Sequence, residues 1–66
     1  MTIGSRIRSR RKELGMSQEE LALKAGYVSR SSVNKIEIGK QNPPVSVIPA
    51  LAAALHTTPA QLMGWD

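Results

Sequence analysis

The chain has 66 residues, 41% of them apolar, which is enough for one small domain only. It contains no cysteine, one histidine and no Phe, which excludes a disulfide framework, a thiolate or histidine-rich metal site, and a cysteine nucleophile. There is neither an apolar run of about 18 residues, as a membrane span requires, nor the apolar segment of a secretory signal. We therefore expect a soluble, cytoplasmic domain with an aliphatic core, no metal and no cofactor.

The net charge of +4 is unevenly distributed along the chain. All nine Lys and Arg residues lie within the first 40 positions, and from Gln41 onward Asp66 is the only formally charged residue. A basic first part suits a polyanion as partner, and a neutral second part suits contact with a protein. A solvated surface can carry the same number of basic residues, so the charge alone leaves both interpretations open.

The spacing of apolar residues predicts five short helices and no strands, because no segment shows sustained two-residue alternation. We expect one domain over residues 1–66, with helices at about 3–14, 18–25, 30–38, 47–56 and 59–64. In the first helix, Ile3, Ile7 and Leu14 lie on one face. Arg11 lies in the same row, where a charge is costly unless it is paired.

Start and stop signals mark the later helices. Ser17 is followed three positions later by Glu20, which predicts a reciprocal capping box. Gly26 suits the left-handed end of the second helix. Hydroxyl caps are likewise expected at Ser29, Ser46 and Thr58, before the third, fourth and fifth helices.

The second and third helices form a helix-turn-helix unit. Ala22 must be small where the two helices approach each other, and Gly26 must adopt a positive φ in the turn. Val33 and Ile36 anchor the third helix on the second. The outer face of the third helix is then free to enter a major groove about 12 Å wide.

Two segments of this unit, QEELALKAG at 18–26 and VNKIEIGK at 33–40, resemble the Cro/phage-repressor (XRE-type) helix-turn-helix domain. The resemblance continues upstream in RIRSRRKELG at 6–15 and downstream through 49–55 and 57–65, so it covers essentially the whole chain. It implies an all-α, compact, five-helix lambda-repressor-like fold whose third helix reads DNA. The turn at Tyr27, Val28 and Ser29 is one residue longer than in the tightest family members.

The resemblance implies two groups of DNA contacts on and around the third helix. The candidates for reading bases are Arg30, Ser31, Asn34 and Lys35. Arg and Lys suit guanine and Asn suits adenine at the major-groove edge. The candidates for contact with the DNA backbone are Gln18, Ser29, Lys40, Gln41 and Asn42. Ordinary solvation is the alternative for the loop residues.

Arg11 and Glu37 lie on or beside the inward rows of the first and third helices, and the family pattern commonly pairs an acid and a base at these places. We therefore expect an ion pair between these two helices. Coulomb attraction and desolvation oppose each other in such a pair, but removal of one partner costs roughly 3–5 kcal/mol if the pair is buried.

The charge-free second part is expected to form a homodimer, at least on DNA. The family's dimer contact often involves the last helix and the loop before the fourth helix. The candidates here are Val45, Val47, Pro59, Met63 and Trp65. The alternative is that Leu62 and Trp65 close the core of the monomer; we expect this for Leu62 and leave it open for Trp65.

Together these features predict a regulator of transcription that binds double-stranded DNA sequence-specifically, with a repressor on a near-palindromic operator as the first interpretation. An antitoxin or a restriction-modification controller with the same fold is an alternative. A protein-interaction or lipid-binding bundle is a third, although the first helix has too few apolar anchors for insertion into a membrane. An enzyme is not expected, because His56 has no second histidine or carboxylate cluster beside it in the sequence, and no small-molecule site is evident.

Overall fold

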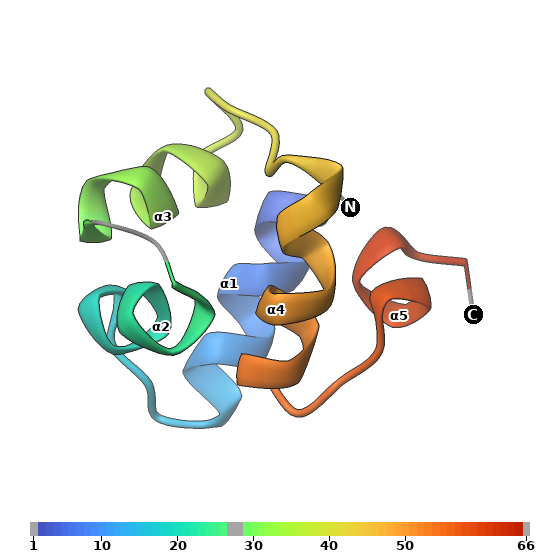
Figure 1. Cartoon of the computed structure of the whole chain (residues 1–66), viewed down its shortest axis with the longest axis horizontal. Coiled ribbons are helices and arrows are strands. Elements are labelled where there is room, and N and C mark those ends of the chain that lie inside the picture. Colours follow the sequence, from blue (N-terminus) through green and yellow to red (C-terminus); the bar gives the residue numbers. More distant parts are fainter. Residues whose placement is uncertain (1, 27–28, 66) are drawn as a thin grey trace.

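The computed structural model describes residues 2–26 and 29–65, and these form five α-helices and one 3-10 turn (Figure 1). The helices are α1 (Ile3–Glu13), α2 (Gln18–Ala25), α3 (Arg30–Glu37), α4 (Ile48–Ala54) and α5 (Pro59–Met63), and the 3-10 turn η1 (Val45–Val47) leads into α4. No strand occurs among these residues, as expected for an all-α fold. None of the described helices has the length and apolar character that a membrane crossing requires.

The helices enclose one aliphatic core. In Figure 1, α1 and α4 occupy the middle, α2 and α3 lie to one side of them, and α5 lies to the other. The largest fully buried side chains come from α1 to α4 and the residue after it: Ile7, Leu21, Val33, Ile36, Leu51 and Leu55. Leu62 of α5 is also buried, with 2% exposure. The Phe-free composition is therefore sufficient to fill the interior of this small domain.

The expected inward row of α1 is wrong at its last position. Leu14 is the C-cap of α1 and remains 37% exposed. Met16, only two residues further, is buried and belongs to the core. The chain turns at Gly15, which has a φ of 66°, and this turn brings Met16 rather than Leu14 into the interior.

The helix caps agree only in part with the sequence patterns. The Ser17 hydroxyl accepts from the Glu20 amide at 3.0 Å, but the Glu20 carboxylate does not reach back; it lies 3.3 Å from Lys24 Nζ. The expected reciprocal box is therefore wrong, because the cation one turn further along α2 takes the carboxylate. Thr58 caps α5 as expected, accepting from the Gln61 amide at 3.2 Å.

Two other expected caps are wrong. Ser29 precedes α3, but its hydroxyl lies 2.9 Å from the Ser31 hydroxyl and makes no capping hydrogen bond to the first turn of α3. Ser46 lies inside η1, and the residue at the start of α4 is Val47, whose side chain cannot cap. Here the 3-10 turn feeds directly into α4. A reciprocal capping box does occur at α1, between Thr2 and Ser5.

Small residues occur at three positions in and beside the helix-turn-helix unit. Ala22 is buried, with 2% exposure, and Gly26 has the expected positive φ, 80°. Tyr27 and Val28 of the expected longer turn lie outside the described residues. The third small residue, Gly4, is buried in α1, and a Cβ placed on it would lie 2.0 Å from the Ile36 carbonyl oxygen. Only glycine therefore permits this approach of α1 to α3.

Arg10 fastens α1 to the end of α4. Its Nε donates to the Leu55 carbonyl at 2.8 Å, and its Nη2 donates to the His56 carbonyl at 3.0 Å. These carbonyls lie at the negative end of the α4 dipole, which favours a cation. Arg10 thus has a structural role, whereas its neighbours Arg8 and Lys12 are exposed on α1.

Candidate nucleic-acid interface

The third helix has one buried face and one exposed face. Val33, Ile36 and Glu37 are buried, with 1%, 2% and 6% exposure. All four candidates for base reading are exposed on the rest of the helix: Arg30, Ser31, Asn34 and Lys35. This division follows from the spacing of three and four residues between the inward positions. It leaves two cations, a hydroxyl and an amide available on one short helix at the edge of the molecule (Figure 1).

The loop after α3 continues this exposed surface. Gly39 has a φ of 85°, and the amides of Lys40 and Gln41 donate to the Lys35 carbonyl at 2.9 and 3.3 Å. The loop is thereby fixed at the end of α3, with Lys40, Gln41 and Asn42 exposed. Ser29 is exposed at the opposite end of the helix. The predicted backbone contacts therefore flank the predicted base contacts at both ends of α3.

The ion pair between Arg11 and Glu37 is confirmed. Arg11 Nε lies 2.7 Å from Glu37 Oε2, and Nη2 donates to Oε1 at 3.0 Å, so the pair is bidentate. A third bond joins Arg11 Nη1 to the Met16 carbonyl at 2.7 Å. The two side chains are 11% and 1% exposed. The pair holds α1 against α3 from the inner side of the third helix.

The side chain of Gln18 points toward α3. Its Nε2 donates to Glu37 Oε1 at 3.1 Å and to Asn34 Oδ1 at 3.2 Å. Sequence reasoning assigned Gln18 to the DNA backbone and did not identify these two partners. The signal for them was present in the sequence, because an amide at the start of α2 and an inward acid on α3 face each other across a helix-turn-helix unit.

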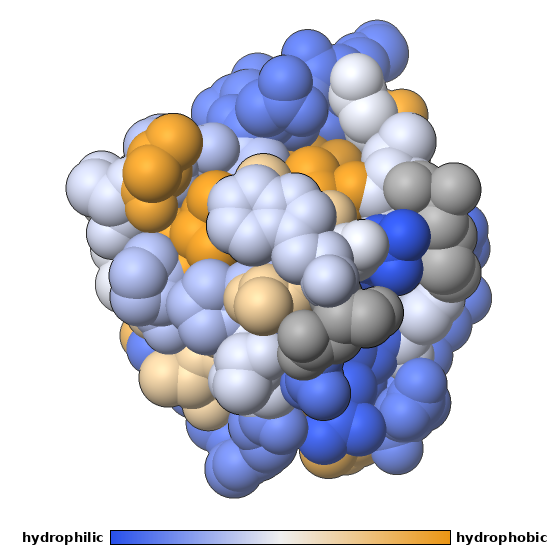
Figure 2. All heavy atoms as spheres, turned by 90° about the vertical axis from the view of Figure 1, so that its right-hand side faces the viewer, coloured by the Kyte–Doolittle hydropathy of each residue, from blue (hydrophilic) through white to orange (hydrophobic). Residues whose placement is uncertain are grey.

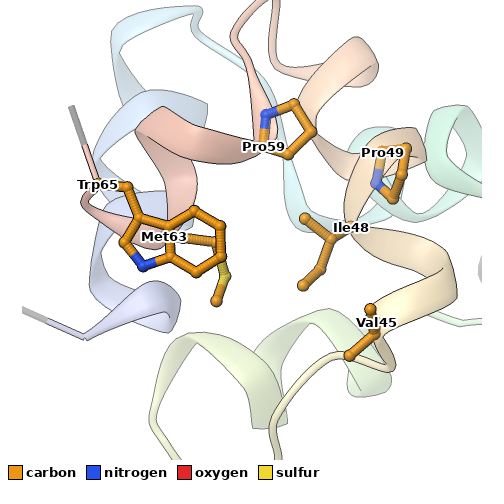
Figure 3. Close-up of a pocket in the computed structure, with 6 residues that line it drawn as sticks. All are labelled: Val45, Ile48, Pro49, Pro59, Met63 and Trp65. Atoms are coloured by element: carbon orange, nitrogen blue, oxygen red, sulfur yellow. The ribbon is translucent and has the colours of Figure 1, made fainter.

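A separate apolar surface lies on the side of the molecule that carries α5. An open hollow of about 280 Å³ lies between α5 and the η1–α4 segment, and we call it the apolar groove (Figure 3). Six side chains line it: Val45, Ile48, Pro49, Pro59, Met63 and Trp65. Figure 2 shows apolar side chains near the middle of this side and hydrophilic ones around them. Four of the six are predicted dimer contacts, whereas Ile48 and Pro49 were not predicted.

The remaining predicted dimer contact, Val47, is half-buried against the core instead of lining the groove. Leu62 is buried in the monomer as expected. Trp65, for which both interpretations were left open, is 75% exposed and therefore does not close the core of the monomer. A neighbouring hollow shares Val45, Ile48 and Met63 with the groove and extends to Asn42. The apolar surface therefore adjoins the loop that follows α3.

A family model described as helix-turn-helix matches residues 7–62, which includes all of α2 and α3. The chain belongs to the helix-turn-helix family. The immunity repressor of Bacillus phage phi105 is 41% identical over 64 residues, which are 97% of this chain and 44% of that protein. This helix-turn-helix domain thus spans less than half the length of that relative.

Solved structures show the same fold. The P22 c2 repressor in complex with a synthetic operator superposes with a TM-score of 0.91 at 32% identity, covering 100% of this chain and 98% of that chain. The restriction-modification controller C.AhdI from Aeromonas hydrophila gives a TM-score of 0.86 at 39% identity, covering 92% of this chain and 91% of that chain. The expected phage-repressor type of five-helix fold is confirmed.

Proposed function

We propose that this domain binds double-stranded DNA sequence-specifically and regulates transcription by placing α3 in the major groove. The observation that carries the proposal is the division of α3 into a face packed on α1 and α2 and an outer face of exposed polar and basic side chains. A major groove about 12 Å wide accepts a helix of this kind, and the first residues of a recognition helix meet the base edges.

The charges around α3 support this role. Arg30 and Lys35 lie on its outer face, and Lys40 follows it, and all three are exposed. Arg11, in contrast, is paired with Glu37 and does not contribute to this surface. Exposed cations beside amide and hydroxyl groups suit phosphate contacts around a set of base contacts.

Repression is the regulatory mode that we propose. The phage phi105 relative is an immunity repressor, and the P22 c2 repressor was solved on an operator. A repressor of this kind acts in the cytoplasm, where it meets the DNA. It is a binding protein, and we assign it no catalytic step.

We further propose that two copies of the domain act together on a near-palindromic operator. The apolar groove with its exposed Val45, Pro59 and Trp65 supports a contact between two copies. Two α3 helices would then enter successive major grooves about 34 Å apart.

DNA binding by fluorescence anisotropy tests this function. Labelled duplex from upstream of the protein's own gene is compared with a scrambled duplex of the same length and composition, across a salt series. We expect the upstream duplex to bind about a thousandfold more tightly or better. Equal affinity for both duplexes, with a steep salt dependence, would reduce the activity to general polyanion binding and refute the proposal.

A restriction-modification controller is the second candidate, favoured by the similarity to C.AhdI. It uses the same α3 surface but a different target. A methyltransferase or endonuclease gene beside this one, together with tight binding to the promoter of that gene pair, would establish this function in place of phage-type repression.

A further inference from the structure

We infer that Gln18 is a positioning residue for base recognition: it fixes the Asn34 side chain so that the Asn34 amide group Nδ2 faces the DNA as a hydrogen-bond donor. This inference rests on the proposed function, because it assumes that the outer face of α3 reads bases. It adds a role for a residue of α2 that lies beside the reading surface and not on it.

The orientation of the Gln18 amide is dictated by Glu37. The Glu37 carboxylate, bound by Arg11 at 2.7 and 3.0 Å, can only accept hydrogen bonds. The group of Gln18 that lies 3.1 Å from Glu37 Oε1 must therefore be Nε2, because an amide oxygen there would face a carboxylate oxygen. The buried ion pair thus sets which end of the Gln18 amide points toward α3.

Asn34 takes its orientation from Gln18 in turn. Gln18 Nε2 has two hydrogens, and it lies 3.2 Å from Asn34 Oδ1 as well as near Glu37. A donor on Gln18 requires an acceptor on Asn34, so Oδ1 points inward and Nδ2 points away. Within residues 2–26 and 29–65, Asn34 Nδ2 donates to no protein group. The Glu37 carboxylate therefore fixes the orientation of the Gln18 amide, and the Gln18 amide fixes that of the Asn34 amide on the surface of α3.

This arrangement determines what Asn34 offers to a base. An Asn that pairs with adenine uses both ends of its amide, donating to N7 and accepting from N6. With Oδ1 turned toward Gln18, Asn34 presents its two hydrogens to an acceptor at the major-groove edge, namely a purine N7, guanine O6 or thymine O4. A side chain that is already oriented also loses less conformational freedom on binding.

A double-mutant cycle on DNA tests the inference. The tightest duplex selected from a random pool is varied one base pair at a time, and affinities are measured for the wild type, Asn34→Ala, Gln18→Ala and the double variant. Asn34→Ala should lose roughly five- to a hundredfold discrimination at one base pair. Gln18→Ala should lose most of the same discrimination at that base pair, and the double variant should lose no more than Asn34→Ala alone.

Gln61→Ala is the matched comparison, because it removes the same amide group from an exposed position on α5, outside the predicted DNA contacts. It should leave the preference at the Asn34-dependent base pair intact. Gln18→Leu, which keeps the bulk of the side chain without its amide, should behave like Gln18→Ala. Thermal unfolding of each variant verifies that it is folded under the conditions of the binding assay.

The side-chain amide signals in nitrogen-15 NMR spectra of the free protein supply a second readout. Gln18→Ala should shift the Asn34 signal, whereas Gln61→Ala should not. If Gln18→Ala weakened all duplexes alike, kept the Asn34-dependent preference and left the Asn34 signal unmoved, Gln18 would be a backbone contact only, and the inference would be wrong while the proposed function stands. A wild type without any sequence preference would overturn the proposed function and the inference with it.

Discussion

Replacement of Glu37 by Ala tests the most buried polar contact of the domain. The substitution removes both hydrogen bonds to Arg11 and one to Gln18, and leaves a guanidinium that is 11% exposed. Breaking a buried pair from one side costs about 3–5 kcal/mol. Arg11 keeps its 2.7 Å bond to the Met16 carbonyl, and some water reaches it, so we expect the lower end of this range.

A loss of about 3 kcal/mol corresponds to a fall in Tm of about 12–24 °C for a domain of this size. Urea unfolding followed by circular dichroism measures the change in free energy directly. Glu20→Ala is the matched control, because its pair with Lys24 is 49% exposed on both sides and should contribute less than about 1 kcal/mol.

A double replacement distinguishes the loss of the ion pair itself from the cost of leaving one buried charge without a partner. Arg11→Met combined with Glu37→Leu removes both charges and fills the same space, so it should recover most of the stability lost in Glu37→Ala. Equal losses in Glu37→Ala and Glu20→Ala would contradict the assignment of a buried pair between α1 and α3.

Three further predictions concern packing, DNA reading and assembly. Gly4→Ala should destabilise the fold by about 1–3 kcal/mol in urea unfolding, because its Cβ would lie 2.0 Å from a backbone oxygen; an unchanged or increased stability would rule out this close approach. Lys35→Ala should relax the preference at one base pair, whereas Lys40→Ala should weaken all duplexes alike and reduce the salt slope by about 1; the reverse pattern would exchange their assignments. Trp65→Ala should weaken self-association in analytical ultracentrifugation without lowering Tm, since Trp65 is 75% exposed, and unchanged association would remove it from the dimer contact.

Local signals in the sequence predicted much of this fold. Ser17, Thr58 and Gly26 act within a few residues of their own positions, so their roles follow from short patterns. The Arg11–Glu37 pair followed from two charges on inward rows, combined with the family pattern. In such cases the sequence neighbourhood or the helix period contains the needed information.

Contacts between distant segments were harder to foresee. A small residue such as Gly4 leaves no mark on hydrophobic periodicity, and its partner is a backbone oxygen on α3. Arg10 caps α4 through the carbonyls of Leu55 and His56, which lie 45 and 46 positions further along the chain. No pattern of side chains in the sequence reveals these contacts. Ser46 looked like a cap because only the three-dimensional path of the chain shows that a 3-10 turn precedes α4.

The same distinction holds for the candidate site. The exposed positions of α3 follow from its helical period, but the orientation of Asn34 depends on a chain of contacts through Gln18 and Glu37. The sequence therefore predicted which side chains of α3 face outward, but it did not predict the orientation of the Asn34 amide.

Titration of the nitrogen-15-labelled domain with its operator duplex tests the central claim most directly. We predict that the largest chemical-shift changes fall on the backbone amides of α3 and on the side chains of Asn34 and Gln18. The loop at 40–42 should also respond. Changes confined to the exposed basic residues of α1, Arg8 and Lys12, with α3 unaffected, would contradict the assignment of α3 as the DNA-reading helix.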